Sequence, residues 1–376
     1  MTVCESEGFI TVDLTKTYPK KELILHDFMD VEYVALETND DFLCQGIVLA
    51  VGREIVIVKN QINDGDLFVF DRNGKALQKF NRKGQGGEEY TGISGITLDE
   101  DYGEMYVNTY NKILVYDFFG NFKRSFPHPD GVRYGNLCNF DGEYLICHDS
   151  NFDQKGATDK SPFVIISKQD GSVKKEISMA CQEKDTAVIK INHNGFIMIG
   201  YNTNFSPIPV ISYQNSWIIT SYLSDTVFQY FPDQSMIPFI VRTPPVNSKN
   251  ADSYFTPVLL SERYYFLQTQ KKEPEVRGTN PNDATLFYRI TDLVYDRQEK
   301  AIYESTVFND DYSNKITVDM LQKKGQDEIA FWEKIEAYQL VEALERGELK
   351  NDKLKEIAAR LDLEDNPVIM LVKHKR

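Results

Sequence analysis

The sequence has little cysteine, with five in 376 residues, and no two of them form a Cys-x-x-Cys pair. That absence argues against a zinc knuckle and against a dithiol redox motif. Three cysteines, Cys44, Cys138 and Cys147, lie within apolar runs. We expect these three thiols to be reduced and buried as small hydrophobic side chains.

Long apolar segments are also missing. No stretch approaches the ~20 apolar residues that span a bilayer as a helix, so we expect no transmembrane segment. Residues 1–8 lack the basic start and hydrophobic core of a signal peptide. The chain is then either cytoplasmic, for example a sensor, or a processed form whose leader lies outside the given sequence. Lipidation of Cys4 and a lipid anchor outside the sequence both stay open.

Basic residues are fewer than acidic ones: the sequence has 42 Lys and Arg and 57 Asp and Glu, which gives a net charge of −15. This balance argues against nucleic acid or an anionic membrane surface as the main partner. Methionine is scarce, with 8 residues, whereas Phe and Tyr number 23 and 21. The aromatic excess favours strands over helices.

A repeated hairpin organises the chain. Residues 67–77 are echoed by residues 113–122, and residues 163–173 form a looser third copy. Each copy is an apolar run, a turn with glycine and a second run. Asn73-Gly74 in the first copy and Asp170-Gly171 in the third supply the positive φ angles of tight turns. The turn glycines at 74, 120 and 171 are 46 and 51 residues apart. Propeller blades repeat at about 40–50 residues.

A second hairpin precedes each of these, so the repeating unit has four short strands, as in a propeller blade. Two more units are longer and less regular. A polar loop, residues 270–282, is inserted in the fifth unit, and the strand-like residues 189–201 have no assigned place in a blade. The inner hairpins are residues 46–58, 92–107 and 137–147, and the later units are residues 210–230 and 258–295.

The two ends of the chain supply one further unit. Apolar residues from Phe331 to Leu344 recur at helical spacing, which predicts a helical insertion over about residues 320–362. Residues 368–372 follow Pro367 as a strand, and residues 31–36 alternate like one. Pairing the two terminal strands closes a ring without open edges. The sequence therefore predicts an all-β, six-bladed β-propeller with four-stranded blades, one domain over residues 10–376.

These features resemble the bacterial six-bladed β-propeller family related to the NHL-repeat propellers. The similarity rests on residues 36–38, 82–90 and 364–369 and on the aromatic-Asp-x-x-Gly hairpins, and it spans about residues 10–374. The family's usual loop reads Gly-x-Gly-Pro-Gly-Glu-Tyr, and Gly87 and Glu88 depart from it, so we expect a less rigid loop. The resemblance implies an exported protein of the periplasm or outer membrane, often a lipoprotein. It implies no particular activity.

The glycine-rich loop is the first candidate ligand site, because successive backbone N–H groups can cradle an anion. It lacks Gly-Lys-Ser/Thr and no helix follows it, so a structural crossing between blades is the preferred interpretation. Arg82 and Lys83 are then either ligands facing the channel or solvated charges. Histidines from different blades can also meet in a propeller channel. The candidate ligand-binding residues are Arg82, Lys83, Gln85, Tyr90, His148 and His193.

Signals for a metal or for catalysis are weak. Residues 60–66 are rich in oxygen ligands but lack the spacing and the distal Glu of a calcium loop, so turn chemistry explains them. No Gly-x-Ser-x-Gly elbow is present, and the carboxylates are too numerous to nominate a pair. We expect no cofactor and no metal, and the catalytic residues, if any, stay unknown.

The sequence thus predicts a non-catalytic binding or scaffold propeller of the bacterial cell envelope, whose ligand is a protein, a peptide or a glycan. The alternative is a propeller enzyme of the lyase or lactonase type with a metal in the central channel. His, Asp or Glu side chains from three or more blades facing the channel would favour the enzyme. An apolar or aromatic face would favour binding. Neither the ligand nor the oligomeric state follows from the sequence.

Overall fold

The computed structural model of the chain describes residues 8–151, 161–180, 188–193, 196–201, 208–221, 223–278, 284–321 and 328–375. The fold is a six-bladed β-propeller, as the sequence predicts. Contacts between residues divide the chain into two interleaved units, which we describe separately. The first unit is Met1–Lys21, Asn151–Pro162 and Ser178–Thr306, and the second is Glu22–Ser150, Phe163–Ile177 and Val307–Arg376.

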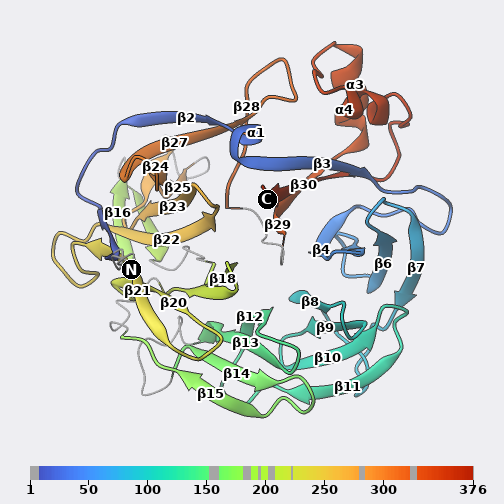
Figure 1. The fold of residues 1–376 in the computed structure, drawn as a ribbon, viewed down its shortest axis with the longest axis horizontal. Coiled ribbons are helices and arrows are strands. Elements are labelled where there is room, and N and C mark those ends of the chain that lie inside the picture. The colour runs from blue at the N-terminus through green and yellow to red at the C-terminus, as the bar shows by residue number, and fades with distance from the viewer. Residues whose placement is uncertain are drawn as a thin grey trace, which may run out of the picture. The chain divides into compact units, whose positions relative to one another are not determined.

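Three four-stranded antiparallel sheets of the second unit coincide with the three repeats (Figure 1). Their middle strands are almost completely buried, which explains why these strands read as continuous apolar runs. The outer strands are charged and partly exposed. The sheets are β4 (Ile47–Val51), β5 (Ile55–Lys59), β6 (Asp66–Asp71) and β7 (Ala76–Asn81); β8 (Gly95–Asp99), β9 (Glu104–Asn108), β10 (Lys112–Asp117) and β11 (Phe122–Pro127); and β12 (Tyr134–Asn139), β13 (Tyr144–Asp149), β14 (Phe163–Ser167) and β15 (Val173–Ile177).

A fourth sheet of this unit joins the two ends of the sequence. β30 (Val368–His374) lies between β29 (Ile329–Ile335) and β3 (Met29–Ala35). β3 and β30 are antiparallel, with Val31 opposite Val372 and Ala35 opposite Val368. The predicted pairing of terminal strands is therefore confirmed.

The predicted start of the helical insertion is wrong. Phe331 and Ile335 lie on β29, where Phe331 pairs with Val372. Phe331 and Trp332 are both buried, because neighbouring residues of this strand are covered on either face. The helices come later, as α3 (Ala337–Glu345) and α4 (Asp352–Ala358), and a single turn, α1 (Leu25–Phe28), precedes β3.

Two sheets of the first unit contain the fourth and fifth predicted blades, and each gains a strand from the N-terminal segment. β1 (Ile10–Asp13) pairs in parallel with β21, with Ile10 opposite Ile240, and β2 (Lys20–Ile24) lies beside β27. Neither β1 nor β2 was predicted from the sequence. The remaining strands are β18 (Val210–Tyr213), β19 (Ser216–Ile219), β20 (Thr226–Tyr230) and β21 (Met236–Thr243) in one sheet, and β22 (Ser253–Leu260), β23 (Tyr264–Lys271), β26 (Ile290–Asp296) and β27 (Ala301–Asn309) in the other. The last residues of β27 belong to the second unit, where Phe308 and Asn309 pair with β28 (Ile316–Thr317).

Two small hairpins complete the described strands. β24 (Glu275–Arg277) lies within residues 270–282, which were predicted to be a polar loop, and its partner β25 (Thr285–Phe287) follows them. β23 extends to Lys271, so that prediction was only partly right. The strand-like residues without a place in a blade form β16 (Val188–His193) and β17 (Phe196–Tyr201), a separate two-stranded sheet.

The turn glycine of each repeat lies against the sheet that precedes it. A Cβ atom on Gly120 would lie 2.5 Å from the ring of Phe80 on β7, and one on Gly171 would lie 2.5 Å from the ring of Phe126 on β11. Gly74 faces the carbonyl oxygen of Ala35, at the end of β3, in the same way. All three glycines have positive φ angles, between 71° and 86°. The glycines that identify the repeats therefore also allow adjacent sheets to approach.

Asn366 joins the two terminal motifs. Its side-chain oxygen accepts from the backbone N–H of Cys44 at 2.8 Å, and its side-chain nitrogen donates to the carbonyl of Glu37 at 2.8 Å. Its own N–H donates to the hydroxyl of Thr38 at 2.8 Å. Residues 36–38 and 364–369, both quoted for the family resemblance, therefore contact each other.

The cysteines are partly as predicted. Cys44, Cys138 and Cys147 are free thiols, and Cys44 and Cys147 are buried, whereas Cys138 is half-buried. Burial raises the pKa of Cys44 to about 11 and that of Cys138 to about 12. Cys4 and Cys181 lie outside the described residues. Over the part of the chain that the structure covers, every helix is too short or too polar to cross a bilayer.

Candidate functional site

Four of the six candidate residues lie in the connection from β7 to β8. Tyr90 is fully buried, and its hydroxyl donates to the carbonyl of Gly65 at 2.7 Å and accepts from the N–H of Arg82 at 3.1 Å. Burial raises the pKa of Tyr90 to about 12. The Arg82 side chain donates to the carbonyl of Gly120 at 3.0 Å, and Lys83 donates to that of Asn63. Gln85 is exposed.

The anion-binding groups of this loop already have a partner. The carboxylate of Glu89 accepts from the N–H of Gly86 at 2.8 Å, and a Cβ atom on Gly84 would collide with the same carboxylate. The ammonium of Lys112 on β10 donates to the carbonyls of Gly86 and Gly87, both at 3.0 Å. These contacts tie the loop to the adjacent sheet, as a structural crossing between blades requires.

The two histidines lie apart from this loop. His148 is on β13, where its side chain is buried and its ring lies 5.0 Å from that of Phe163. Burial lowers the pKa of His148 to about 4, so the ring is neutral at pH 7. His193 is the last residue of β16, and its side chain lies outside the described part of the structure. The structure thus brings together only the four loop residues.

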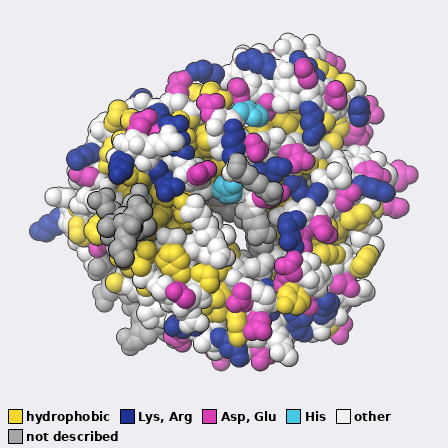
Figure 2. Space-filling model, in the orientation of Figure 1, with side chains coloured by type: hydrophobic (Ala, Val, Ile, Leu, Met, Phe, Trp, Pro, Cys, Tyr) yellow, Lys and Arg dark blue, Asp and Glu magenta, His cyan; other side chains and the backbone are white. Residues whose placement is uncertain are grey.

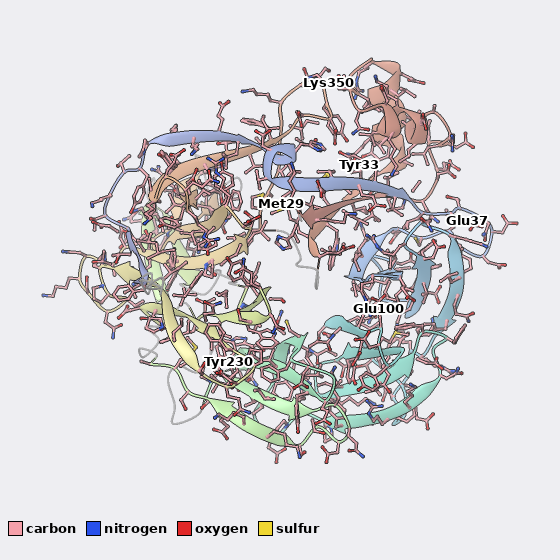
Figure 3. All side chains as sticks on the ribbon, in the orientation of Figure 1. Met29, Tyr33, Glu37, Glu100, Tyr230 and Lys350 are labelled. Atoms are coloured by element: carbon pink, nitrogen blue, oxygen red, sulfur yellow. The ribbon has the colours of Figure 1, made fainter. Side chains whose placement is uncertain are left out.

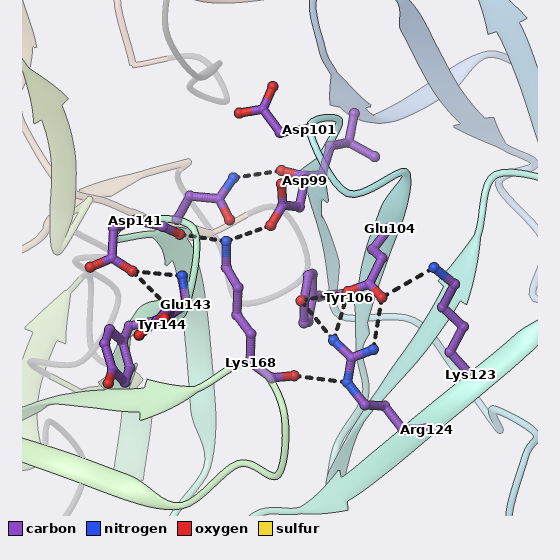
Figure 4. Close-up of polar contacts among 12 residues, drawn as sticks. Asp99, Asp101, Glu104, Tyr106, Lys123, Arg124, Asp141, Glu143, Tyr144 and Lys168 are labelled. Atoms are coloured by element: carbon purple, nitrogen blue, oxygen red, sulfur yellow. Dashed lines mark hydrogen bonds and ion pairs between the residues drawn. The ribbon is translucent and has the colours of Figure 1, made fainter.

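One charged cluster of the second unit was not predicted from the sequence (Figure 4). The Lys168 ammonium lies 2.5 Å from a carboxylate oxygen of Asp99 and 2.6 Å from the carbonyl of Asp141. The Lys168 and Asp99 side chains are only 6% and 7% exposed. The cluster links the sheet of β8–β11 to that of β12–β15.

Arg124 extends the cluster on β11. Its guanidinium donates two hydrogen bonds to the carboxylate of Glu104, at 2.8 and 2.6 Å, and a third to the carbonyl of Lys168 at 2.8 Å. Burial raises the pKa of Glu104, but the hydrogen bonds from Arg124, Tyr106 and Lys123 outweigh it and lower that pKa to about 2. Each charge faces an opposite charge or a hydrogen-bond partner, so the cluster holds two sheets together.

Other carboxylates accept hydrogen bonds from backbone N–H groups of neighbouring turns. Glu100, between β8 and β9, accepts from the N–H groups of Arg53, Glu54 and Ile55 at 2.6, 2.9 and 3.2 Å. Glu37, after β3, accepts from the N–H of Ala76 at 3.0 Å. Figure 3 labels both glutamates, each next to the sheet of β4–β7. No local motif identifies these contacts, because each joins residues about 40 or more positions apart.

The described residues contain no set of side chains arranged to bind a metal ion. Among those residues, no three His, Cys, Asp or Glu side chains gather closely enough to hold an ion. On the face drawn in Figure 2, Lys and Arg side chains alternate with Asp and Glu, without a large area of one sign.

The two ends of the four-stranded sheets differ in the lengths of the connections that they carry. In an antiparallel blade, the first-to-second and third-to-fourth connections lie at one end, which we call the turn end. The second-to-third connection and the crossing to the next blade lie at the other, the loop end. Turn-end connections have two to five residues: 52–54, 72–75, 100–103, 118–121, 140–143, 168–172, 214–215, 231–235, 261–263 and 297–300. Loop-end connections are mostly longer: 60–65, 82–94, 109–111, 128–133, 150–162, 178–209, 220–225, 244–252, 272–289 and 310–328.

Both extra hairpins lie in loop-end connections. β16–β17 interrupts the crossing after β15, and β24–β25 lies between β23 and β26. The loop ends therefore carry most of the long connections, on a scaffold whose other ends are tight turns. Binding residues of rigid folds concentrate on such loops.

Residues 9–373 match the family model described as "Domain of unknown function (DUF4934)". The chain belongs to this family. No curated protein matches the chain.

Three solved structures are similar to this chain, and the first of them, with a TM-score above 0.5, has the same fold. A Bacteroides fragilis protein described as exported has a TM-score of 0.60 at 12% identity, over 98% of this chain and 100% of its own. A DUF4221 family member from Bacteroides vulgatus has a TM-score of 0.46 at 8% identity, covering 93% and 99%. BamB from Moraxella catarrhalis has a TM-score of 0.41 at 7% identity, covering 92% and 99%. At such identities the likeness concerns the fold alone.

Proposed function

We propose that this DUF4934 member is a non-catalytic binding or scaffold propeller of the bacterial cell envelope, which recognises a protein, peptide or glycan at the loop ends of its sheets. The observation that carries the proposal is the difference between the two ends. In the five sheets that have all four blade strands, every turn end is closed by five residues or fewer, whereas the loop ends carry two extra hairpins and connections as long as residues 178–209.

The polar clusters support the same proposal. The carboxylates of Asp99, Glu100 and Glu104 bond to backbone or basic groups of adjacent elements. These carboxylates stabilise the packing of the sheets, as expected of a scaffold. An envelope location draws on the Bacteroides fragilis protein of the same fold, which is described as exported.

A photo-crosslinking experiment tests the proposal on one sheet. Tyr110 lies at the loop end of the β8–β11 sheet and is 68% exposed, and Tyr102 lies at its turn end and is 60% exposed. Each is replaced in turn by p-benzoylphenylalanine in cells that produce the full chain. We expect crosslinked adducts from position 110 in clear excess over position 102, because only the loop end faces a partner.

Position 102 is the matched control, because it lies at the opposite end of the same sheet and its side chain has an exposed fraction close to that of Tyr110. Equal yields at the two positions, or adducts at 102 alone, would contradict the proposal. Absence of adducts at both positions would also count against it.

A further inference from the structure

A buried histidine lies at the loop end of the β8–β11 sheet, where the chain crosses to the next sheet. His128 is the first residue of that crossing, residues 128–133, and it is the only one of the six that is buried. Pro129, Asp130 and Gly131 are exposed, and the last two residues are half-buried. The crossing is therefore attached to the sheets through the His128 side chain more than through any other.

The contacts of His128 determine which ring nitrogen carries the hydrogen. The amide nitrogen of Asn108, on β9, donates to the carbonyl of Tyr134 at 2.6 Å, so the amide oxygen faces the His128 ring. Nε2 of the ring lies 3.1 Å from this oxygen, which can only accept, and Nε2 therefore donates. Nδ1 is buried and makes no hydrogen bond of regular geometry. A second proton on the ring would thus bind at Nδ1.

The surroundings of the ring disfavour that second proton. Burial lowers the pKa of His128 to about 4; the backbone of Tyr110 acts in the opposite direction, and the Arg133 guanidinium lowers the pKa further. The Tyr134 ring packs edge-on with its centre 4.9 Å away, and burial raises the pKa of its hydroxyl, which stays neutral. Asp149 accepts from the backbone N–H of Arg133 at 2.8 Å. Among the described residues, no carboxylate shifts the His128 pKa, so nothing there compensates a charged ring.

Three backbone N–H groups report on whether the crossing is attached. That of His128 donates to the carbonyl of Asn111 at 2.9 Å, and that of Arg133 donates to Asp149. The N–H of Ser150, at the end of the next sheet, donates to the carbonyl of Arg133 at 2.8 Å. Each of these bonds joins the crossing to another segment, so all three break when the crossing detaches.

We infer that His128 is an acid sensor of this loop end, and that protonation of its buried ring detaches the crossing of residues 128–133 together with the surface that it supports. That surface includes Tyr110, whose ring centre lies 4.5 Å from the Arg133 guanidinium. The inference rests on the proposed loop-end function and adds a regulation of it by pH. A histidine that is buried in its neutral form contributes stability that is complete above its ordinary pKa of 6.5 and is lost as the pH falls from there to about 4.

Amide hydrogen exchange of the full-length protein tests the inference. Protection factors, which remove the direct effect of pH on the exchange rate, are measured at pH 7 and pH 5 for His128, Arg133 and Ser150. We expect them to fall by about 20-fold between the two pH values, because at pH 5 the ring is protonated in the detached state and neutral in the attached one. The protection factor of Gly120, whose N–H donates to the carbonyl of Asp117 at the turn end of the same sheet, should stay unchanged.

Two variants identify the histidine that is responsible. His128→Gln should give equal protection factors for Arg133 and Ser150 at the two pH values, because glutamine does not titrate. His148→Gln is the matched control, since His148 is also buried and burial also lowers its pKa to about 4, but it lies on β13, outside the crossing. This variant should keep the fall in protection.

Several results would overturn the inference. They are equal protection at pH 7 and pH 5 in the parent, a fall of the same size at Gly120, a fall that persists in His128→Gln, and loss of the fall in His148→Gln. Crosslinking from position 110 at both pH values separates the two proposals. Equal yields of adducts at pH 7 and pH 5 would support the loop-end function while the sensor failed, and a pH-dependent fall in protection without adducts would support the sensor while the loop-end function failed.

Discussion

Gly120 shows how a single residue serves both the turn and the packing of the sheets. Its φ angle of +81° suits the tight turn, and its missing side chain leaves room for the ring of Phe80 from the preceding sheet. Gly103, in the turn between β8 and β9, has a similar φ of +61° but no atom within 4 Å of the Cβ position. The pair therefore separates the cost of backbone conformation from the cost of contact between sheets.

We predict that Gly120→Ala destabilises the protein far more than Gly103→Ala. A left-handed conformation costs an alanine about 1–2 kcal/mol, which both variants incur. Overpacking against Phe80 adds about 1–3 kcal/mol for Gly120→Ala only. Urea unfolding of the two variants beside the parent measures the difference, and equal losses would show that the sheets do not meet at Gly120.

Glu104 gives a prediction on pH. Its pKa falls from an ordinary 4.5 to about 2 in the folded protein. A depressed carboxyl pKa contributes stability that is complete above the unfolded pKa and is lost as the pH falls through the folded one. The contribution of Glu104 should therefore disappear between about pH 4.5 and pH 2.

Glu104→Gln should consequently flatten the loss of unfolding free energy between pH 5 and pH 2. At pH 7 the variant should be less stable by about 3–5 kcal/mol, because Arg124 is left without its charged partner. Asp101→Asn, at a carboxylate 74% exposed, is the control and should change neither quantity much. Denaturant titrations at several pH values measure the unfolding free energy. Parallel profiles of this free energy against pH for the parent and Glu104→Gln would refute the prediction.

β30 is the element on which the terminal sheet depends, because it has a neighbour on each side. Five of its residues, Val368–Val372, are at most 2% exposed, and it pairs with both β3 and β29. Deleting residues 366–376 also removes Asn366 and its contacts to residues 37–44. The loss thus reaches all three segments of the sheet.

We predict that this truncated chain is insoluble or melts far below the full-length protein. Each buried aliphatic side chain is worth roughly 1.5–3 kcal/mol, so the loss of five is comparable with the whole ~5–15 kcal/mol stability of a typical domain. Replacing residues 273–288 with a short turn is the control, because no residue of β24 or β25 is buried and loop length affects stability only weakly. Thermal melting compares the three proteins, and a truncated chain as stable as the parent would show that β30 is dispensable.

At the scale of the whole molecule, the sequence predicted what is local and repeated. Hairpins around Gly74, Gly120 and Gly171 carry their own turn chemistry, so the blades followed from their spacing. β2 was missed because Lys20–Ile24 is mostly charged and becomes a strand only beside β27. The residues of β29 satisfied a helical spacing and a buried strand equally well, and pairing with β30 decided between them.

Less of the candidate site than of the fold could be predicted from the sequence. The loop of residues 82–90 was found because its glycines are adjacent in sequence, but the role of Glu89 as its internal anion depends on how the loop folds back. Lys168 and Asp99 are 69 positions apart, and nothing local distinguishes them from other charged residues at strand ends. The difference between turn ends and loop ends emerges only once every strand has its bounds.

The pairing of β3 with β30 also has a consequence for the time at which the protein can be completed. Ala35 is synthesised 333 residues before its partner Val368. At about 5–20 residues per second, β3 waits on the order of tens of seconds for the strand that covers it. Throughout that interval the buried side chains of β3, Tyr33 and Val34 among them, lack their native neighbours. A nascent chain of this design leaves these side chains of β3 available to chaperones until β30 has emerged.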